Sequence, residues 1–144
     1  MGQTHYPLIN PVVDGVPLRE LVGAFEIAQG WAKSCCYDGL APQYYRYGNM
    51  EDHFNGYLTG FIGNPNKTVM LVCNCGVYTC WPLQAKIEED MDSEIVTWRD
   101  FEQPFRPERD YSGFGPFVFD WGDYLMVLDD LVEELKTRYP GLET

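Results

Sequence analysis

Near the N-terminus, apolar residues recur every three or four positions and predict a helix that begins at Pro17 and ends at Gly30. Proline suits the first turn of a helix, and glycine suits the position after its end. The apolar positions of this helix are Leu18, Leu21, Val22, Phe25 and Ala28. Just before it, "LINPVVDGVPL" predicts a short extended segment that turns at Asp14 and Gly15.

A second helical stripe closes the chain. Asp120 is a candidate N-cap, with Asp123 three residues on in an approximate capping-box position, and Pro140 and Gly141 stop the helix. Its apolar stripe consists of Tyr124, Leu128, Leu131, Leu135 and Tyr139, widened by Leu125 and Val132. Lys136 and Arg138 fall in the last turn, where the helix dipole favours cations.

Between the two helices the pattern is that of strands. The predicted strands are "YLTGFIG" (57–63), "TVMLVCNC" (68–75), "WPLQAKI" (81–87), "SEIVTWRDF" (93–101) and "FVFD" (117–120). The turn-rich "NPNK" makes a hairpin of the first two, and in the third Trp81, Leu83, Ala85 and Ile87 alternate with polar or proline residues. The acidic run "EEDMD" (88–92) is predicted to be a turn. Residues 31–57 have no clean period and are interpreted as a packed loop region.

This order of elements predicts an α+β fold. We expect an antiparallel sheet of about four to six strands, with an N-terminal and a C-terminal helix packed on it. A chain of 144 residues favours a single domain, residues 1–144, and 45% hydrophobic content gives it enough apolar surface to form a core.

Charge narrows the classes of partner. The 22 acids and 10 bases give a net charge of −12, and residues 101–144 alone hold ten acids and four bases, or −6. Nucleic acids and anionic membranes attract clustered Lys and Arg, so neither is expected as a partner. The N-terminus has no signal-peptide pattern, and no apolar run could span a bilayer, so we expect a cytoplasmic protein in which disulfides are rare.

Three of the five cysteines, Cys73, Cys75 and Cys80, lie close together in "VMLVCNCGVYTCWPL". The favoured interpretation is that they are small core residues, with Val69, Leu71, Cys73 and Cys75 on one face of a strand, and that no cofactor is bound. The alternative is a structural zinc site on these three residues. Its fourth ligand would come from Cys35, Cys36, His53 or His5.

An enzyme is a further alternative. His53 in "MEDHFNG" has Glu51 and Asp52 beside it, and such neighbours are expected to raise the pKa of the imidazole. Ser112 in "DYSGFGP" is the most suggestive nucleophile, but the G-x-S-x-G pattern of serine hydrolases is absent. No catalytic residue is therefore assigned.

Three stretches, "NPVVDGVPLRELV", "CNCGVYTCWPLQAKI" and "VTWRDFEQPFRPERDYSGFGPFVFD", give the chain its most distinctive pattern. The pattern combines C-x-C-G-x3-C-W-P-L with V-x-W-x-D-F-x-Q-P and G-P-F-V-F-D, and it resembles that of a group of small acidic bacterial proteins over roughly residues 8–130. No activity is associated with the group. The resemblance implies a bacterial or phage origin and no site residues.

The charge pattern favours a non-enzymatic domain that binds another protein, in the most concrete form an inhibitor or immunity-type protein that occludes a basic partner such as a toxin. Acidic and arginine side chains are the candidate contacts, since aromatic residues with arginine are typical of binding hot spots. The predicted partner-binding residues are Glu88, Glu89, Asp90, Asp92, Asp123, Asp130, Glu133, Glu134, Arg106 and Arg109.

Overall fold

The computed structural model describes residues 8–31, 37–41, 50–57, 59, 63–75 and 79–138. Its helices are α1 (Leu18–Ala28), α3 (Met50–Phe54) and α4 (Trp121–Arg138). Its strands are β1 (Val12–Val13), β2 (Val16–Pro17), β3 (Tyr37–Asp38), β4 (Thr68–Cys73), β5 (Leu83–Asp90), β6 (Ile95–Glu102) and β7 (Phe117–Asp120). The predicted α+β class is confirmed.

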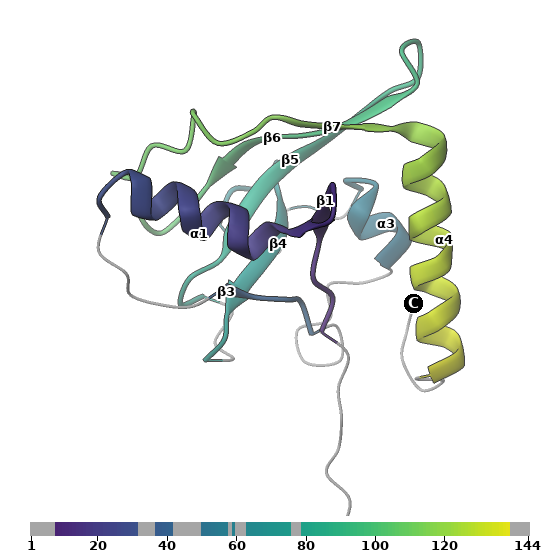
Figure 1. Ribbon diagram of the computed structural model, residues 1–144, viewed down its shortest axis with the longest axis horizontal. Coiled ribbons are helices and arrows are strands. Elements are labelled where there is room, and N and C mark those ends of the chain that lie inside the picture. The colour runs from purple at the N-terminus through teal and green to yellow at the C-terminus, as the bar shows by residue number, and fades with distance from the viewer. Residues whose placement is uncertain are drawn as a thin grey trace, which may run out of the picture.

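Five strands form one antiparallel sheet in the order β3-β4-β5-β6-β7, so each strand pairs with the next described strand of the chain. The long hairpin β5–β6 is its centre, with Glu88 opposite Thr97 and Asp90 opposite Ile95. Figure 1 shows this hairpin projecting at the top, with α1 and α4 at opposite ends of the molecule. The sheet therefore has two distinct ends, one near α1 and β3 and the other near α4 and β7.

The N-terminal pattern folds as its sequence predicts. β1 and β2 form a hairpin joined by a two-residue turn. The turn residues, Asp14 (φ 50°) and Gly15 (φ 83°), are in the left-handed conformation. α1 follows at once from Pro17, and Gly30 (φ 77°) ends it. An isolated bridge pairs Ile9 with Leu40, which ties the start of the described chain to the main sheet.

α4 is also confirmed. The backbone N–H of Asp123 donates to Asp120 Oδ2 at 2.9 Å, which is the predicted cap. Leu128 and Leu135 are buried, and α4 packs on β6, β7 and α3. The short helix α3 was missed, because it lies in the stretch interpreted as a packed loop region, and five residues are too few to show a period. No described helix is long and apolar enough to cross a membrane.

The core confirms the strand pattern with two exceptions. All six residues of β4 are buried, as are Leu83 and Ala85 of β5. Gln84, expected to face solvent, is fully buried, because its amide accepts from the backbone N–H of Asn64 at 2.9 Å and donates to the Asn64 carbonyl at 3.3 Å. The predicted turn at 88–92 is also displaced. β5 continues to Asp90, and residues 91–94 make the turn.

Two predictions lie wholly or partly outside the described residues. In the strand predicted over 57–63, residues 58 and 60–62 are not described, and the flanking Tyr57 and Gly63 are not in a strand. Residues 76–78 and 139–144 are not described either, which includes Tyr139 of the predicted stripe.

Candidate functional site

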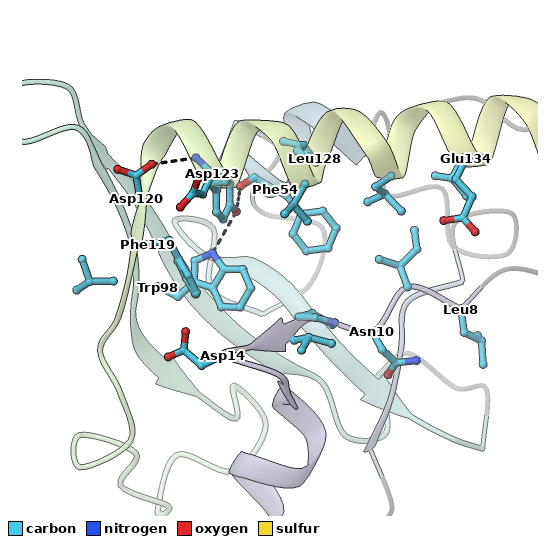
Figure 2. Close-up of a pocket in the computed structure, with 18 of the residues that line it drawn as sticks. Leu8, Asn10, Asp14, Phe54, Trp98, Phe119, Asp120, Asp123, Leu128 and Glu134 are labelled. Atoms are coloured by element: carbon cyan, nitrogen blue, oxygen red, sulfur yellow. Dashed lines mark hydrogen bonds between the residues drawn. The ribbon is translucent and has the colours of Figure 1, made fainter.

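A groove of about 720 Å³ runs along α4. One wall is α4, the other is the N-terminal segment 8–14, and between them lie β6, β7 and the end of α3 (Figure 2). We call this space the α4 groove. Its lining residues are Leu8, Ile9, Asn10, Pro11, Val12, Asp14, Phe54, Trp98, Val118, Phe119, Asp120, Asp123, Tyr124, Val127, Leu128, Leu131, Glu134, Leu135 and Arg138.

Large apolar side chains are unusually open in this groove. Leu8 is 50% exposed, Val12 52%, Val118 57% and Val127 69%. These are four of the ten large hydrophobic residues that are exposed in the described chain, and all four line the same groove. Exposed apolar residues that gather in one concave place indicate a surface for an interaction, whereas scattered ones do not.

Hydrogen bonds and ring packing hold the side chains at the base of the groove in place. The indole N–H of Trp98 donates to the Tyr124 hydroxyl at 3.1 Å, and that hydroxyl donates to the carbonyl of Phe54, which joins β6, α4 and α3 (Figure 2). Burial raises the pKa of Tyr124, so its proton stays in place at all ordinary pH values. Trp98 also packs edge-on against Phe119 with ring centroids 4.7 Å apart.

Carboxylates surround this apolar floor. Asp120 and Asp123 lie at one end, Glu134 lies toward the other end, and Asp14 stands on the opposite wall (Figure 2). The one cation of the lining is Arg138, which pairs with Glu134 at 3.4 Å. No described cation forms an ion pair with Asp14, Asp120 or Asp123. The rim thus presents negative charge that this part of the chain does not neutralise.

The predicted acidic residues fall into two groups that adjoin each other. Ile95 of β6 is the strand partner of Asp120 of β7, and the backbone N–H of Trp121 donates to the Glu94 carbonyl at 2.9 Å. The β5–β6 turn therefore lies beside the start of α4. Asp90 ends β5 and Asp92 lies in this turn, and Asp90 Oδ1 accepts from the backbone N–H of Asp92. Of the predicted contact residues, the groove itself includes Asp123 and Glu134 but neither Asp130 nor Glu133, which are exposed elsewhere on α4.

Two other predicted contacts on the hairpin are engaged locally. Glu88 pairs with Arg99 at 2.9 Å across the β5–β6 ladder, and this pairing lowers the pKa of Glu88. Glu89 lies beside Tyr57, and its charge raises the pKa of that phenol. The hairpin therefore offers less uncompensated charge than its sequence suggests.

The two predicted arginine contacts are directed inward. The Arg106 guanidinium lies 3.3 Å from the centroid of the Trp81 ring, a cation–π arrangement. Arg109 lies over both Trp31 and Trp81, at 5.1 and 4.9 Å, and is 3.9 Å from Glu26. Both side chains thus cover the protein's own tryptophans.

Glu26 is the centre of a partly buried polar cluster, here called the Glu26 cluster. Its carboxylate accepts hydrogen bonds from Tyr37 at 2.6 Å and from Tyr111, while the Tyr37 hydroxyl in turn accepts from the side chains of Trp81 and Gln103. Burial and then the charge of Glu26 raise the pKa of Tyr37, and burial with the Glu26 hydrogen bond raises the pKa of Tyr111 to about 12. Both phenols remain donors at neutral pH.

The cysteine prediction is partly wrong. Cys73 is buried as expected, but β4 ends there, so Cys75 stands in the following turn and is exposed, and Cys80 is half-buried. The three sulfur atoms lie within 4.8 Å of one another, close enough to share a metal ion. Cys75 and Cys80 are reduced thiols, whereas Cys73 is disulfide-bonded. The pKa of the Cys80 thiol is raised, first by its hydrogen bond with the Cys75 thiol and then by burial. The positive charge of nearby Arg106 lowers this pKa in part.

His53 differs from its prediction. It is 2% exposed, and its Nε2 lies 2.8 Å from the Val69 carbonyl, an arrangement in which Nε2–H donates. Burial lowers the imidazole pKa to about 4 and outweighs the hydrogen bond to the Val69 carbonyl, which raises it, so the increase expected from Glu51 and Asp52 is wrong. His53 therefore stays neutral inside the core at ordinary pH.

No family model matches the chain, and no curated protein and no solved structure shows a significant similarity to it. The α4 groove was not predicted, because its lining comes from four separate parts of the chain. The exposed Val118 and Val127 stand in sequence patterns that look like ordinary strand and helix residues. The predicted contact residues Asp123 and Glu134 pointed to this end of the molecule, although the groove itself was not predicted.

Proposed function

We propose that this chain is a protein-binding domain whose α4 groove holds a basic, amphipathic segment of a partner protein. The observation that carries the proposal is the combination of an open apolar floor with an acidic rim. Apolar side chains of the partner would cover Val12, Val118 and Val127, and its Lys or Arg residues would meet Asp14, Asp120 and Asp123. A second copy of this chain is a poor occupant, because both copies would be strongly acidic.

The net charge of −12 supports the same choice of partner. Long-range attraction speeds the encounter with a basic protein, and the apolar contacts in the groove then set how long the complex lasts. In its most concrete form this is an inhibitor or immunity-type protein of the cytoplasm that covers a basic partner such as a toxin. The role requires no catalytic residue and no cofactor.

A titration with synthetic peptides tests the proposal. The probe is a 20-residue peptide that alternates Leu-rich and Lys-rich positions, and the comparison peptide has Glu in place of each Lys. We expect calorimetry to detect binding of the Lys peptide alone, with affinity that falls as salt rises from about 50 to about 200 mM because the rim charges become screened. Equal binding of both peptides, or binding indifferent to salt, contradicts the proposal.

Matched charge variants locate the binding surface. Asp14→Asn with Asp123→Asn removes two rim charges, whereas Asp129→Asn with Asp130→Asn removes two exposed charges of α4 outside the lining. Asparagine tolerates the left-handed backbone of residue 14. We expect the first pair to weaken Lys-peptide binding about 5- to 30-fold, at roughly 0.5–1 kcal/mol per charge, and the second pair to change it less than 2-fold. Equal effects would mean that net charge acts without the groove.

A second candidate function, of another class, is the binding of a soft divalent metal ion. The observation that favours it is the approach of the sulfur atoms of Cys73, Cys75 and Cys80 to within 4.8 Å. Metal analysis of the purified, reduced protein tests it. About one ion per chain supports the function, and metal-free folded protein rejects it.

A further inference from the structure

The three clustered cysteines span the connection between two core strands. β4 ends at Cys73 and β5 begins at Leu83, so Cys75 and Cys80 flank the link between them. In a tetrahedral zinc site with zinc–sulfur bonds of about 2.3 Å, the sulfur atoms stand about 3.8 Å apart. Sulfur atoms already within 4.8 Å need shift by only about 1 Å to reach that geometry.

The cluster is held together locally and is open to solvent. The backbone N–H of Cys75 donates to the Cys73 sulfur at 3.4 Å, which keeps the turn after β4 close to the end of that strand. Cys75 is exposed, so an ion can reach the cluster from solvent.

We infer that Cys73, Cys75 and Cys80 of the reduced chain hold one zinc ion as a structural clip across the β4–β5 connection. This inference rests on the second candidate function and identifies its ion, its ligands and its role. Thiolates select zinc over magnesium or calcium, which take oxygen ligands. Each thiol releases its proton as it binds the ion. The disulfide at Cys73 withholds that sulfur, so the site forms only after a thiol or phosphine reductant has opened it.

A structural zinc site has four ligands, and the described residues supply three. The fourth position is left to a ligand outside this cluster of described residues.

The test uses the whole chain purified with a phosphine reductant. Zinc is measured by mass spectrometry, and cobalt is then substituted so that its sulfur charge-transfer band reports thiolate ligation. We expect about one zinc per chain, and at least a 10-fold loss of zinc affinity in both Cys75→Ser and Cys80→Ser. Asn74→Ala, which leaves every sulfur in place, should keep its zinc. Because Cys75 is exposed, Cys75→Ser should fold even if Cys80→Ser does not.

The outcomes separate the inference from the function on which it rests. If no ion is bound, both fail. If an ion is bound but survives in Cys75→Ser, or shows no sulfur band with cobalt, the metal function stands and the proposed ligand set is wrong. A chelator should also lower the unfolding temperature of the wild type by several degrees while leaving that of Cys75→Ser unchanged. A bound ion whose removal leaves the unfolding temperature unchanged would overturn the role as a clip.

Discussion

The two ends of the sheet use similar residues in opposite ways. In the Glu26 cluster, beside α1 and β3, tyrosine, tryptophan and arginine side chains bind one another, and Tyr37, Trp81 and Tyr111 are all less than 10% exposed. In the α4 groove, aromatic residues again form the floor, but apolar side chains and carboxylates remain open to solvent. Residue type alone therefore does not mark a binding surface, because what matters is whether the side chains already have partners.

The comparison bears on the two arginines, whose role as partner contacts stays a prediction. A loop rich in aromatic residues and arginine has the composition of a binding hot spot, yet Arg106 and Arg109 cover tryptophans of their own chain. The residues of the α4 groove lack this hot-spot composition, but more of their apolar surface is exposed. Four predictions can break or sharpen the contrast.

The largest effect is expected from Tyr37→Phe. It removes a hydroxyl that accepts from Trp81 and Gln103 and donates to Glu26, so two buried donors lose their partner. At about 1–3 kcal/mol for each unsatisfied group, we expect a loss of roughly 3 kcal/mol in the free energy of unfolding, measured with urea. Tyr57→Phe, at a phenol that is 65% exposed, is the control and should change stability by less than about 0.5 kcal/mol. A similar small change in Tyr37→Phe would mean that the cluster is not a tight unit.

The second prediction concerns the pH dependence of stability, through the buried His53 of α3. Native His53 has a pKa of about 4, against about 6.5 in the unfolded chain, so between these values the unfolded state binds the extra proton. The stability from His53 is complete above pH 6.5 and is lost as pH falls toward 4. From pH 7.5 to 5.5 we expect a loss of about 1.5 kcal/mol by urea unfolding.

His53→Gln is the matched variant for this measurement, since glutamine keeps a donor for the Val69 carbonyl and does not titrate. Its stability should be nearly flat over the same pH range. An equal pH dependence in wild type and variant would assign the effect to carboxylates.

The open apolar floor of the groove gives a smaller effect, on binding only. Val127 lines the groove and Met126 does not, although both are on α4 and about equally exposed, at 69% and 67%. Val127→Ser should weaken the Lys-rich peptide about 5- to 10-fold, because roughly 1 kcal/mol of apolar contact is lost, and Met126→Ser should leave affinity unchanged. Both variants should unfold at the wild-type temperature. Equal binding losses would place the peptide on another face of α4.

The smallest effect is expected on the β5–β6 hairpin. The Glu88–Arg99 pair is exposed, and exposed pairs add little to stability. Glu88→Gln should leave the unfolding temperature unchanged within error in a calorimetric scan. A clear decrease would show that the hairpin is a cooperative part of the core and not a projecting arm.

Sequence patterns predicted elements better than sites. The helices at Leu18 and Trp121 follow from apolar spacing and caps, which are local properties of the chain. Strand β4 was predicted from its apolar run, but its end at Cys73 was not, because Cys75 continues the alternation into a turn. Burial of Gln84 and His53 depends on hydrogen bonds to Asn64 and Val69, which are 20 and 16 residues away. Such partners become visible only once the chain is folded.

One wall of the α4 groove depends on a close approach between two segments of backbone. The segment around Ile9 is held by two backbone hydrogen bonds to Leu40, at 2.8 and 2.9 Å, and this close approach needs Gly39, where an added Cβ would stand 2.7 Å from the Ile9 carbonyl oxygen. A methyl group at position 39 would clash with the backbone of this wall, so the wall and the chain beside β3 could not both keep their places. Glycine at one position outside the groove lining therefore lets this wall stand where it does.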